Sequence, residues 1–184
     1  MKVYILSMQQ VNNYGSVLQA YSLKKMIESL GNEVRFLAIE KGTNAALRTQ
    51  CEKKDIEKNE SWLETQWNRV KGKIFGRKLR IVFSEFRNST GLCSVNGDEH
   101  FDTCVIGSDE VFNCLQKSKW GFSSQLFGKV EVAERVITYA ASCGSTKVDN
   151  LSDELREAIK SAMSDLAVVS VRDKNTADFV EKVS

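Results

Sequence analysis

The first forty residues alternate between strand-like and helix-like patterns, and this order constrains the fold more than any other feature of the chain. Val3–Leu6 is a short apolar run, and Ser7–Ser16 is a polar loop. The next segment runs to about Leu30, and its apolar residues recur at helical spacing: Val17, Ala20, Leu23, Ile27. Gly31 stands where a C-terminal helix cap belongs, and Val34–Ile39 is a second strand. This order predicts a right-handed parallel βαβ crossover.

The stretch Phe101–Asn113, which reads F-D-T-C-V-I-G-S-D-E-V-F-N, predicts a central strand. Its β-forming apolar run ends at Gly107, and polar residues follow at once, which is typical of a buried strand. Side chains that follow a parallel strand lie at the ligand-binding edge of an α/β sheet. We therefore expect Ser108 and Asp109 to meet a ligand. The alternative is that Asp109 only caps a following helix.

Two further strands are expected at Arg135–Ala141 and Leu166–Val171, with a helix between them that Ser152 caps. A final helix begins at Asn175 or Thr176. The fold class predicted from these elements is α/β, with a Rossmann-like parallel sheet of about five strands flanked by helices. We expect residues 1–184 to form a single domain with a basic helical insertion at about 41–96, whose tip is mobile. Because the last helix is cut short, we expect this domain to be the first half of a two-domain protein.

Composition excludes several classes of site and partner. The net charge is +2, the five cysteines form no C-x-x-C pair, and His100 is the single histidine, so no metal site is expected. Reduced thiols in a cytoplasmic protein are the simpler account of the cysteines. The sequence has no apolar run of about 18 residues, so no membrane span is expected. The near-neutral charge argues against nucleic acid as a partner.

Four strand ends carry small or polar residues, which predicts a binding site at one edge of the sheet. The candidate ligand contacts there are Asn13, Tyr14, Gly15, Ser108, Asp109, Ser142 and Arg172. The loop after the first strand, Ser7–Ser16, has neither the G-x-G-x-x-G nor the G-x-x-x-x-G-K pattern. This argues against a dinucleotide or nucleoside triphosphate bound in those modes.

Each candidate also has a structural alternative. Gly15 lets backbone N–H groups approach an anion or only permits a turn. For Tyr14 the two roles are stacking on a sugar and covering the core. For Ser142 they are donating to a sugar hydroxyl and ending the strand. Arg172 binds a carboxylate or phosphate bidentately, or forms an ion pair with Asp173 or Asp109.

The segment Arg69–Arg80 holds six basic residues and no acidic one, with Ile74 and Phe75 among them. Most such runs are solvated faces of helices. With the interleaved apolar residues, such a run can instead contact an anionic membrane surface or nucleic acid, and the near-neutral net charge makes nucleic acid the least expected of these partners. The expected location is cytoplasmic. Contact through this segment would place the protein at the inner face of the membrane.

Four motifs in order resemble the polysaccharide pyruvyl transferase family. Asn12–Leu23 is similar to the family's N-Y-G-A-x-L-Q-A-Y-A-L, and Phe101–Asn113 to its F-D-x-x-I-x-G-S-D-Q-V-W-N. Ile137–Gly144 resembles Y-A-A-S-F-G, and Val169–Asp173 resembles S-V-R-E. The chain departs from these patterns at Glu110, Phe112 and Cys143, where the family usually has Gln, Trp and Phe. The added charge of Glu110 bears on the identity of the donor.

The resemblance implies the N-terminal half of a two-domain, GT-B-like enzyme. It implies transfer of a pyruvyl group from phosphoenolpyruvate to a sugar of a cell-surface polysaccharide or of its lipid-linked precursor, without a further cofactor. The donor-binding basic residues then belong to the missing C-terminal domain. We assign Asp109 to orient or deprotonate the acceptor hydroxyl. Asn13, Tyr14, Gly15, Ser108 and Ser142 are assigned to the acceptor side and Arg172 to the interdomain cleft. The alternatives are a non-catalytic sugar- or anion-binding domain and an interaction module that another chain completes.

Overall fold

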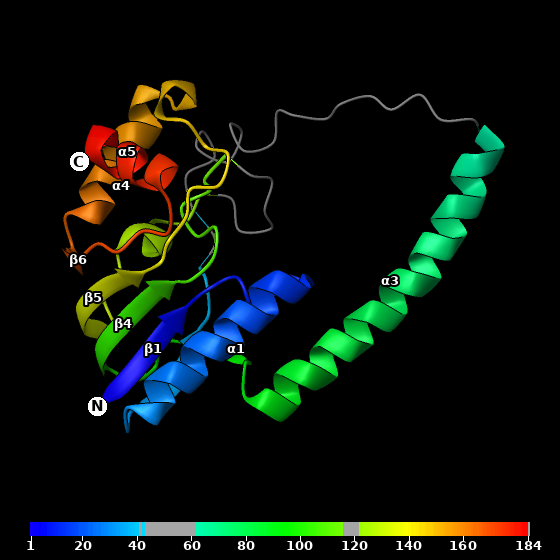
Figure 1. Ribbon diagram of the computed structural model, residues 1–184, viewed down its shortest axis with the longest axis horizontal. Coiled ribbons are helices and arrows are strands. Elements are labelled where there is room, and N and C mark those ends of the chain that lie inside the picture. The colour runs from blue at the N-terminus through cyan, green and yellow to red at the C-terminus, as the bar shows by residue number, and fades with distance from the viewer. Residues whose placement is uncertain (41, 43–61, 116–121, 184) are drawn as a thin grey trace.

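The structure is a computed structural model that describes residues 1–40, 42, 62–115 and 122–183, with the backbone alone for 62–75. In this part of the chain six parallel strands form one sheet in the order β3-β2-β1-β4-β5-β6 (Figure 1). The strands are β1 (Lys2–Leu6), β2 (Glu33–Leu37), β3 (Ser94–Val95), β4 (Phe101–Gly107), β5 (Ala133–Tyr139) and β6 (Leu166–Val168). This is the strand order of the doubly wound Rossmann fold, in which the order reverses between β1 and β4. The predicted α/β Rossmann-like class is confirmed.

Helices cover both faces of the sheet. The α-helices are α1 (Tyr14–Ser29), α3 (Trp62–Thr90), α4 (Asp153–Met163) and α5 (Lys174–Val183). The 3-10 helices are η1 (Ser124–Phe127) and η2 (Val148–Asn150). Val3 and Ile5 pack with buried residues of α1 and with Phe83 of α3. Tyr4 and Leu6 point the other way and share a core with residues of α4 and α5. The central strands are buried on both faces, which is why they are continuous apolar runs.

Helix α1 begins earlier than the sequence predicts. The predicted loop extends to Ser16, but the helix starts at Tyr14 because the Asn13 side chain caps it, accepting a hydrogen bond of 2.7 Å from the backbone N–H of Gly15. Its end agrees with the prediction, since Leu30 is the C-cap and Gly31 follows with a φ of 80°. That left-handed conformation is one that glycine adopts without strain.

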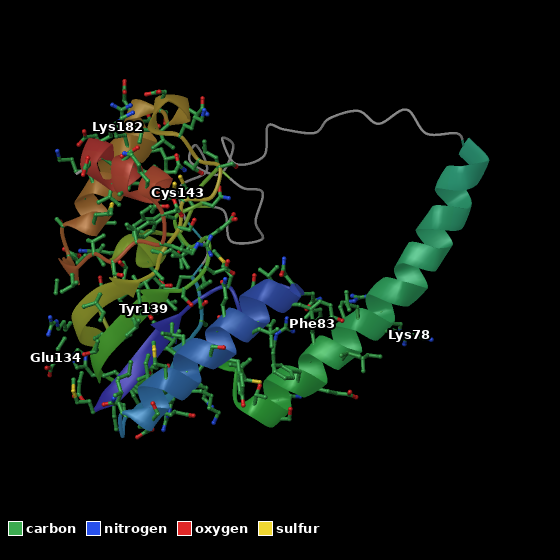
Figure 2. All side chains as sticks on the ribbon, in the orientation of Figure 1. Lys78, Phe83, Glu134, Tyr139, Cys143 and Lys182 are labelled. Atoms are coloured by element: carbon green, nitrogen blue, oxygen red, sulfur yellow. The ribbon has the colours of Figure 1, made fainter. Side chains whose placement is uncertain are left out.

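The segment expected as an insertion contributes to the sheet. Its tip, residues 43–61, lies outside the described residues, as does residue 41. The segment then supplies α3 and the two-residue strand β3, which pairs with β2 and gives one strand more than expected. The C-terminal part of α3 packs on α1, and Figure 2 shows Phe83 between the two helices.

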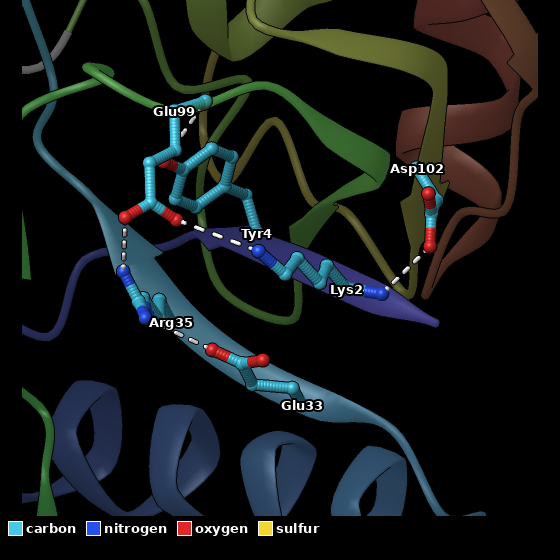
Figure 3. Close-up of polar contacts among 6 residues, drawn as sticks. All are labelled: Lys2, Tyr4, Glu33, Arg35, Glu99 and Asp102. Atoms are coloured by element: carbon cyan, nitrogen blue, oxygen red, sulfur yellow. Dashed lines mark hydrogen bonds and ion pairs between the residues drawn. The ribbon is translucent and has the colours of Figure 1, made fainter.

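The connection from β3 to β4 crosses β2 and β1, because β3 and β4 lie on opposite sides of these two strands. Glu99 in this connection accepts a hydrogen bond from the Tyr4 hydroxyl on its carbonyl, at 3.1 Å, and forms an ion pair with Arg35 at 3.2 Å (Figure 3). The backbone N–H of Lys2 donates to Asp102 at 2.7 Å. These charged groups are about half exposed, so they fix the path of the chain more than they stabilise the fold.

The last third of the chain follows the prediction with shifted boundaries. Ser152 caps α4 as expected, accepting from the Leu155 N–H at 3.2 Å. Strand β5 begins and ends two residues before its predicted bounds, and β6 stops at Val168. A single bridge between Ala141 and Val171 continues the pairing beyond both strands.

Candidate functional site

The candidate site lies at the edge of the sheet where the parallel strands end. Asn13 to Gly15 follow β1, Ser108 and Asp109 follow β4, Ser142 follows β5 and Arg172 follows β6. Because all six strands are parallel, these segments leave the sheet at one edge. The order of the strands reverses between β1 and β4, which is where open α/β sheets bind ligands.

Gly107 brings β4 close to β5 before the chain reaches Ser108 and Asp109. It has a φ of 140°, and a Cβ at this position would collide with the carbonyl oxygen of Tyr139. Asp109 then lies half-buried, with Oδ1 accepting a hydrogen bond of 2.8 Å from the N–H of Glu110. Within the described chain Oδ2 of Asp109 accepts no hydrogen bond, so this oxygen is available to a hydroxyl group.

Ser142 ties the β4 and β5 ends together. Its N–H donates to the carbonyl of Asp109 at 3.1 Å, and its own carbonyl accepts from the N–H of Phe112 at 3.0 Å. The side chain is buried, donates to Oδ2 of Asp173 at 3.1 Å and accepts from the N–H of Gly144 at 3.1 Å. In this geometry the hydroxyl positions Asp173. Its predicted contact with a sugar stays a prediction.

Asp173 caps α5 and joins the β5 and β6 ends. Its Oδ1 accepts from the N–H of Thr176 at 2.8 Å and from the Thr176 hydroxyl at 2.9 Å. The backbone hydrogen bond from Thr176 is the largest cause that lowers the pKa of Asp173, and the nearby charge of Arg172 adds to it. Arg172 is exposed and forms no ion pair within 4.0 Å among the described residues, although its N–H donates to Ala141 at 2.9 Å. The alternative of a close ion pair with Asp173 or Asp109 is therefore not what the geometry shows.

A second polar network lies beside the first and was not predicted. Glu110 accepts from the Asn113 amide at 2.8 Å, and Oδ1 of Asn113 accepts from the Thr146 hydroxyl at 2.8 Å. A Cβ on Gly144 would lie 2.5 Å from the Glu110 carboxylate and 2.6 Å from the Asn113 amide, so a side chain here would push these two groups aside, and the φ of 55° also favours glycine. The polar residues of the Phe101–Asn113 motif were the available signal, but their partner at position 146 lies too far along the sequence to be inferred.

Side chains of α3 and β3 hold the loop between β1 and α1. Arg87 of α3 donates through Nε to the carbonyl of Gln9 at 2.7 Å, and through Nη2 to the carbonyl of Val11 at 3.1 Å and to Oδ1 of Asn12 at 2.7 Å. The amide of Gln9 also donates to Ser94 of β3 at 2.9 Å. The loop is thus fixed to α3 and β3.

The predicted residues of this loop make their described contacts within α1 and with α3. Asn13 caps α1, and Gly15 provides the donor for that cap. The ring of Tyr14 is exposed and lies 4.9 Å, between centroids, from the ring of Phe83. The hydrogen bonds described above join the loops after β4, β5 and β6 to one another. The loop after β1 reaches the same edge without a hydrogen bond to them in the described chain.

Ser7 is a buried polar residue at this edge of the sheet that sequence reasoning did not single out. It directly follows β1, and because Leu6 pairs with Ile106, Ser7 lies beside Gly107 at the point where the strand order reverses. Ser7 is fully buried, and its hydroxyl oxygen has no hydrogen-bond partner among the described residues. A buried hydroxyl without a partner costs free energy. The only sequence signal was its place after an apolar run.

A pocket of about 260 Å³ lies between α5 and the segment around η2. None of the predicted site residues lines it. Two of its residues belong to the polar networks, since Thr146 donates to Asn113 and the Asn175 amide donates to the carbonyl of Gly144 at 3.0 Å. Its lining consists of Thr146, Lys147, Val148, Asp149, Asn175, Asp178, Phe179 and Lys182.

Two general properties of the described residues bear on the class of site. They contain no group of three or more His, Cys, Asp or Glu side chains placed to hold a metal ion. Among their helices, none combines the length and apolar character needed to cross a bilayer.

Comparison with known proteins identifies the family of this chain. A family model described as polysaccharide pyruvyl transferase matches residues 13–183. Searches of curated proteins and of solved structures found no match. The matched range begins at Asn13 and includes Asp109, Ser142 and Arg172, so it takes in the strand ends described above. It covers most of the sequence, and the chain therefore belongs to the polysaccharide pyruvyl transferase family.

Proposed function

We propose that the protein transfers a pyruvyl group from phosphoenolpyruvate to hydroxyl groups of a sugar, in a cell-surface polysaccharide or its lipid-linked precursor. In this reaction a proton is added to C3 of the enol and one sugar hydroxyl forms a bond to C2, which gives a tetrahedral adduct that still carries the phosphate. A second hydroxyl of the same sugar then bonds to C2 as the bond from C2 to the phosphate oxygen breaks. The product is a cyclic ketal, and of the two hydroxyl protons one balances the proton added to C3 and the other leaves with inorganic phosphate. The family membership supports the reaction class.

Asp109 carries the acceptor side of the proposal. It follows β4 at the reversal of the strand order, it is half-buried, and its Oδ2 is free of hydrogen bonds from the described chain. A carboxylate so placed accepts the proton of an attacking hydroxyl, or aligns that hydroxyl by a hydrogen bond. This free carboxylate oxygen is the observation on which the proposal rests.

The neighbouring residues shape the acceptor site. Ser108, which directly precedes Asp109 and is partly exposed, is proposed to hydrogen-bond sugar hydroxyls. Tyr14 offers an exposed aromatic ring at the start of α1, on which a sugar face packs. Asn13 and Gly15 hold the start of α1 in place, and that is the role their contacts support.

The donor side is proposed to lie toward Arg172. Its guanidinium is exposed and free of ion pairs within the described chain, and guanidinium groups bind carboxylate and phosphate bidentately. Phosphoenolpyruvate carries both groups and needs several cationic contacts. A second lobe that supplies the others is part of this proposal.

The test is phosphate release from phosphoenolpyruvate by the full-length protein in the presence of an acceptor glycan. Asp109→Asn keeps the shape and removes the base, and we expect the rate of turnover to fall by about 10²–10⁴-fold. Asp149→Asn is the matched control, since Asp149 is exposed in the pocket beside α5, and its rate is expected to stay at the wild-type value. Normal turnover by Asp109→Asn, or a selective loss in Asp149→Asn, contradicts the assignment.

A further inference from the structure

Helix α3 has two faces with different partners. Leu79, Phe83 and Phe86 lie toward α1, where the rings of Phe83 and Tyr14 are 4.9 Å apart and those of Phe86 and Tyr21 are 5.8 Å apart. Ile81 and Val82 are on the helix surface away from this contact and are 51% and 53% exposed. Figure 1 shows the N-terminal half of α3 lying beyond the body that the sheet and the other helices form. Helices in proteins gain most of their stability from tertiary packing, so a helix that extends beyond the body of the protein is expected to have a partner.

The exposed face of α3 is apolar, with basic residues before Val82 and one exposed acidic residue after it, Glu85. Arg77 and Lys78 are exposed, and they precede Ile81 by four and three residues, so all three share one face of the helix. Figure 2 shows Lys78 on the outer side of α3. Neither cation forms an ion pair within the described chain. Arg80 is exposed too, and its Nε donates only to the carbonyl of Gly76, one turn earlier.

The sequence continues this pattern toward the start of the helix. Between Arg69 and Arg80 there are six basic residues and no acidic one, although the chain as a whole has a net charge of only +2. Ile74 precedes Ile81 by two turns, and Val70 precedes Ile74 by one, so apolar positions recur in register with Ile81. Apolar positions flanked by cations are the pattern of helices that lie in the plane of a membrane surface.

We propose that α3 docks the protein on an anionic lipid bilayer, with Ile81 and Val82 facing the acyl boundary and Arg77, Lys78 and Arg80 facing the headgroups. Charge decides against a second copy of the chain as the occupant, because a symmetric contact would place the two basic segments against each other. The apolar residues on the same face decide against nucleic acid. This proposal does not rest on the transferase reaction, and its test involves no turnover.

The test is sedimentation of the full chain with vesicles of phosphatidylcholine alone and of phosphatidylcholine with phosphatidylglycerol in equal parts. We expect binding to the anionic vesicles and little to the neutral ones. Raising the salt from about 0.15 M to about 1 M shortens the Debye length to about 3 Å and should weaken binding. The variant with Arg77→Glu, Lys78→Glu and Arg80→Glu should lose at least about 100-fold in its partition coefficient, since each basic residue at an anionic surface contributes about 1 kcal/mol.

Matched controls separate this surface from net charge and from folding. The control for charge reverses three exposed basic residues elsewhere and should bind like the wild type: Arg135→Glu, Lys147→Glu, Lys182→Glu. Replacing Ile81 and Val82 by Ser should cost about tenfold or more in partitioning, with the free energy of unfolding unchanged because both side chains are exposed.

The control for the apolar pair is Leu18→Ser with Leu30→Ser, two exposed positions, one on α1 and one at its C-cap. Equal binding to neutral and anionic vesicles, or equal losses in the α3 variants and their controls, would overturn the proposal. Lipid-free self-association that the α3 charge reversal abolishes would overturn it as well, in favour of a second copy.

Discussion

Arg87 joins helix α3 to the loop after β1, and its replacement by Met is the sharpest test of how that loop is held. The side chain is 9% exposed and donates three hydrogen bonds, to the carbonyls of Gln9 and Val11 and to the side chain of Asn12. Its guanidinium also lies 5.5 Å from the centroid of the Phe83 ring. Methionine keeps most of the packing volume and removes all three donors.

The expected loss follows from which acceptors water can reach afterwards. Val11 and Asn12 are exposed, so water replaces the lost donors at small cost. Gln9 is 1% exposed, and leaving its carbonyl unpaired costs about 1–3 kcal/mol. Loss of the cation–π contact adds about 0.5–1 kcal/mol. Relief of the buried charge offsets part of this, and burial does lower the pKa of Arg87. We expect the free energy of unfolding to fall by about 2–3 kcal/mol.

The measurement is urea unfolding of Arg87→Met, with Arg80→Met as the control on the same helix. Arg80 is exposed and bonds only to its own helix, so its replacement should change the free energy of unfolding by less than about 0.5 kcal/mol. Equal midpoints for the two variants would refute the reasoning, because Arg87 would then not hold the loop.

Three further predictions concern the edge of the sheet. Gly107→Ala should lower the free energy of unfolding by at least about 2 kcal/mol, because residue 107 has a left-handed φ and its Cβ would collide with Tyr139. The control is Gly76→Ala, which lies in open space on α3 and should raise the free energy of unfolding by up to about 1 kcal/mol. Thermal unfolding of both variants measures the difference. Asp173 has a lowered pKa in the fold, so its stabilising effect is present above the unfolded pKa of about 3.9 and is lost as the pH falls through the folded pKa. The difference in unfolding free energy between the wild type and Asp173→Asn should therefore shrink on acidification. A difference that does not depend on pH would contradict this. Ser7→Ala should keep or slightly raise the free energy of unfolding, because the buried hydroxyl has no hydrogen-bond partner among the described residues; a loss of more than about 1 kcal/mol in urea unfolding would contradict this.

Local patterns in the sequence predicted the elements that local chemistry determines. The apolar run before Gly107 identified β4 and placed Asp109 at its end, and the helical spacing before Gly31 fixed the end of α1. The start of α1 was predicted too late because the capping role of Asn13 was not recognised. Strand β3 has two residues, which is too short for any periodicity to show.

Contacts between distant segments could not be predicted in the same way. The hydrogen bond from Arg87 to Gln9 joins residues 78 positions apart in the sequence, and the one from Thr146 to Asn113 joins residues 33 positions apart. Nothing within either segment indicates its partner. The unpartnered hydroxyl of Ser7 becomes visible only when burial and hydrogen bonds are both known. The parallel order of the strands, by contrast, follows from the βαβ pattern, and it is what brings the strand ends to one edge.

The most direct test of the account is a crystal structure of the full-length protein with an acceptor glycan bound. The account predicts that a sugar hydroxyl lies within about 3.2 Å of the Asp109 carboxylate, at the ends of β1 and β4. A glycan seated in the pocket between η2 and α5, with Asp109 free of contacts, would contradict it.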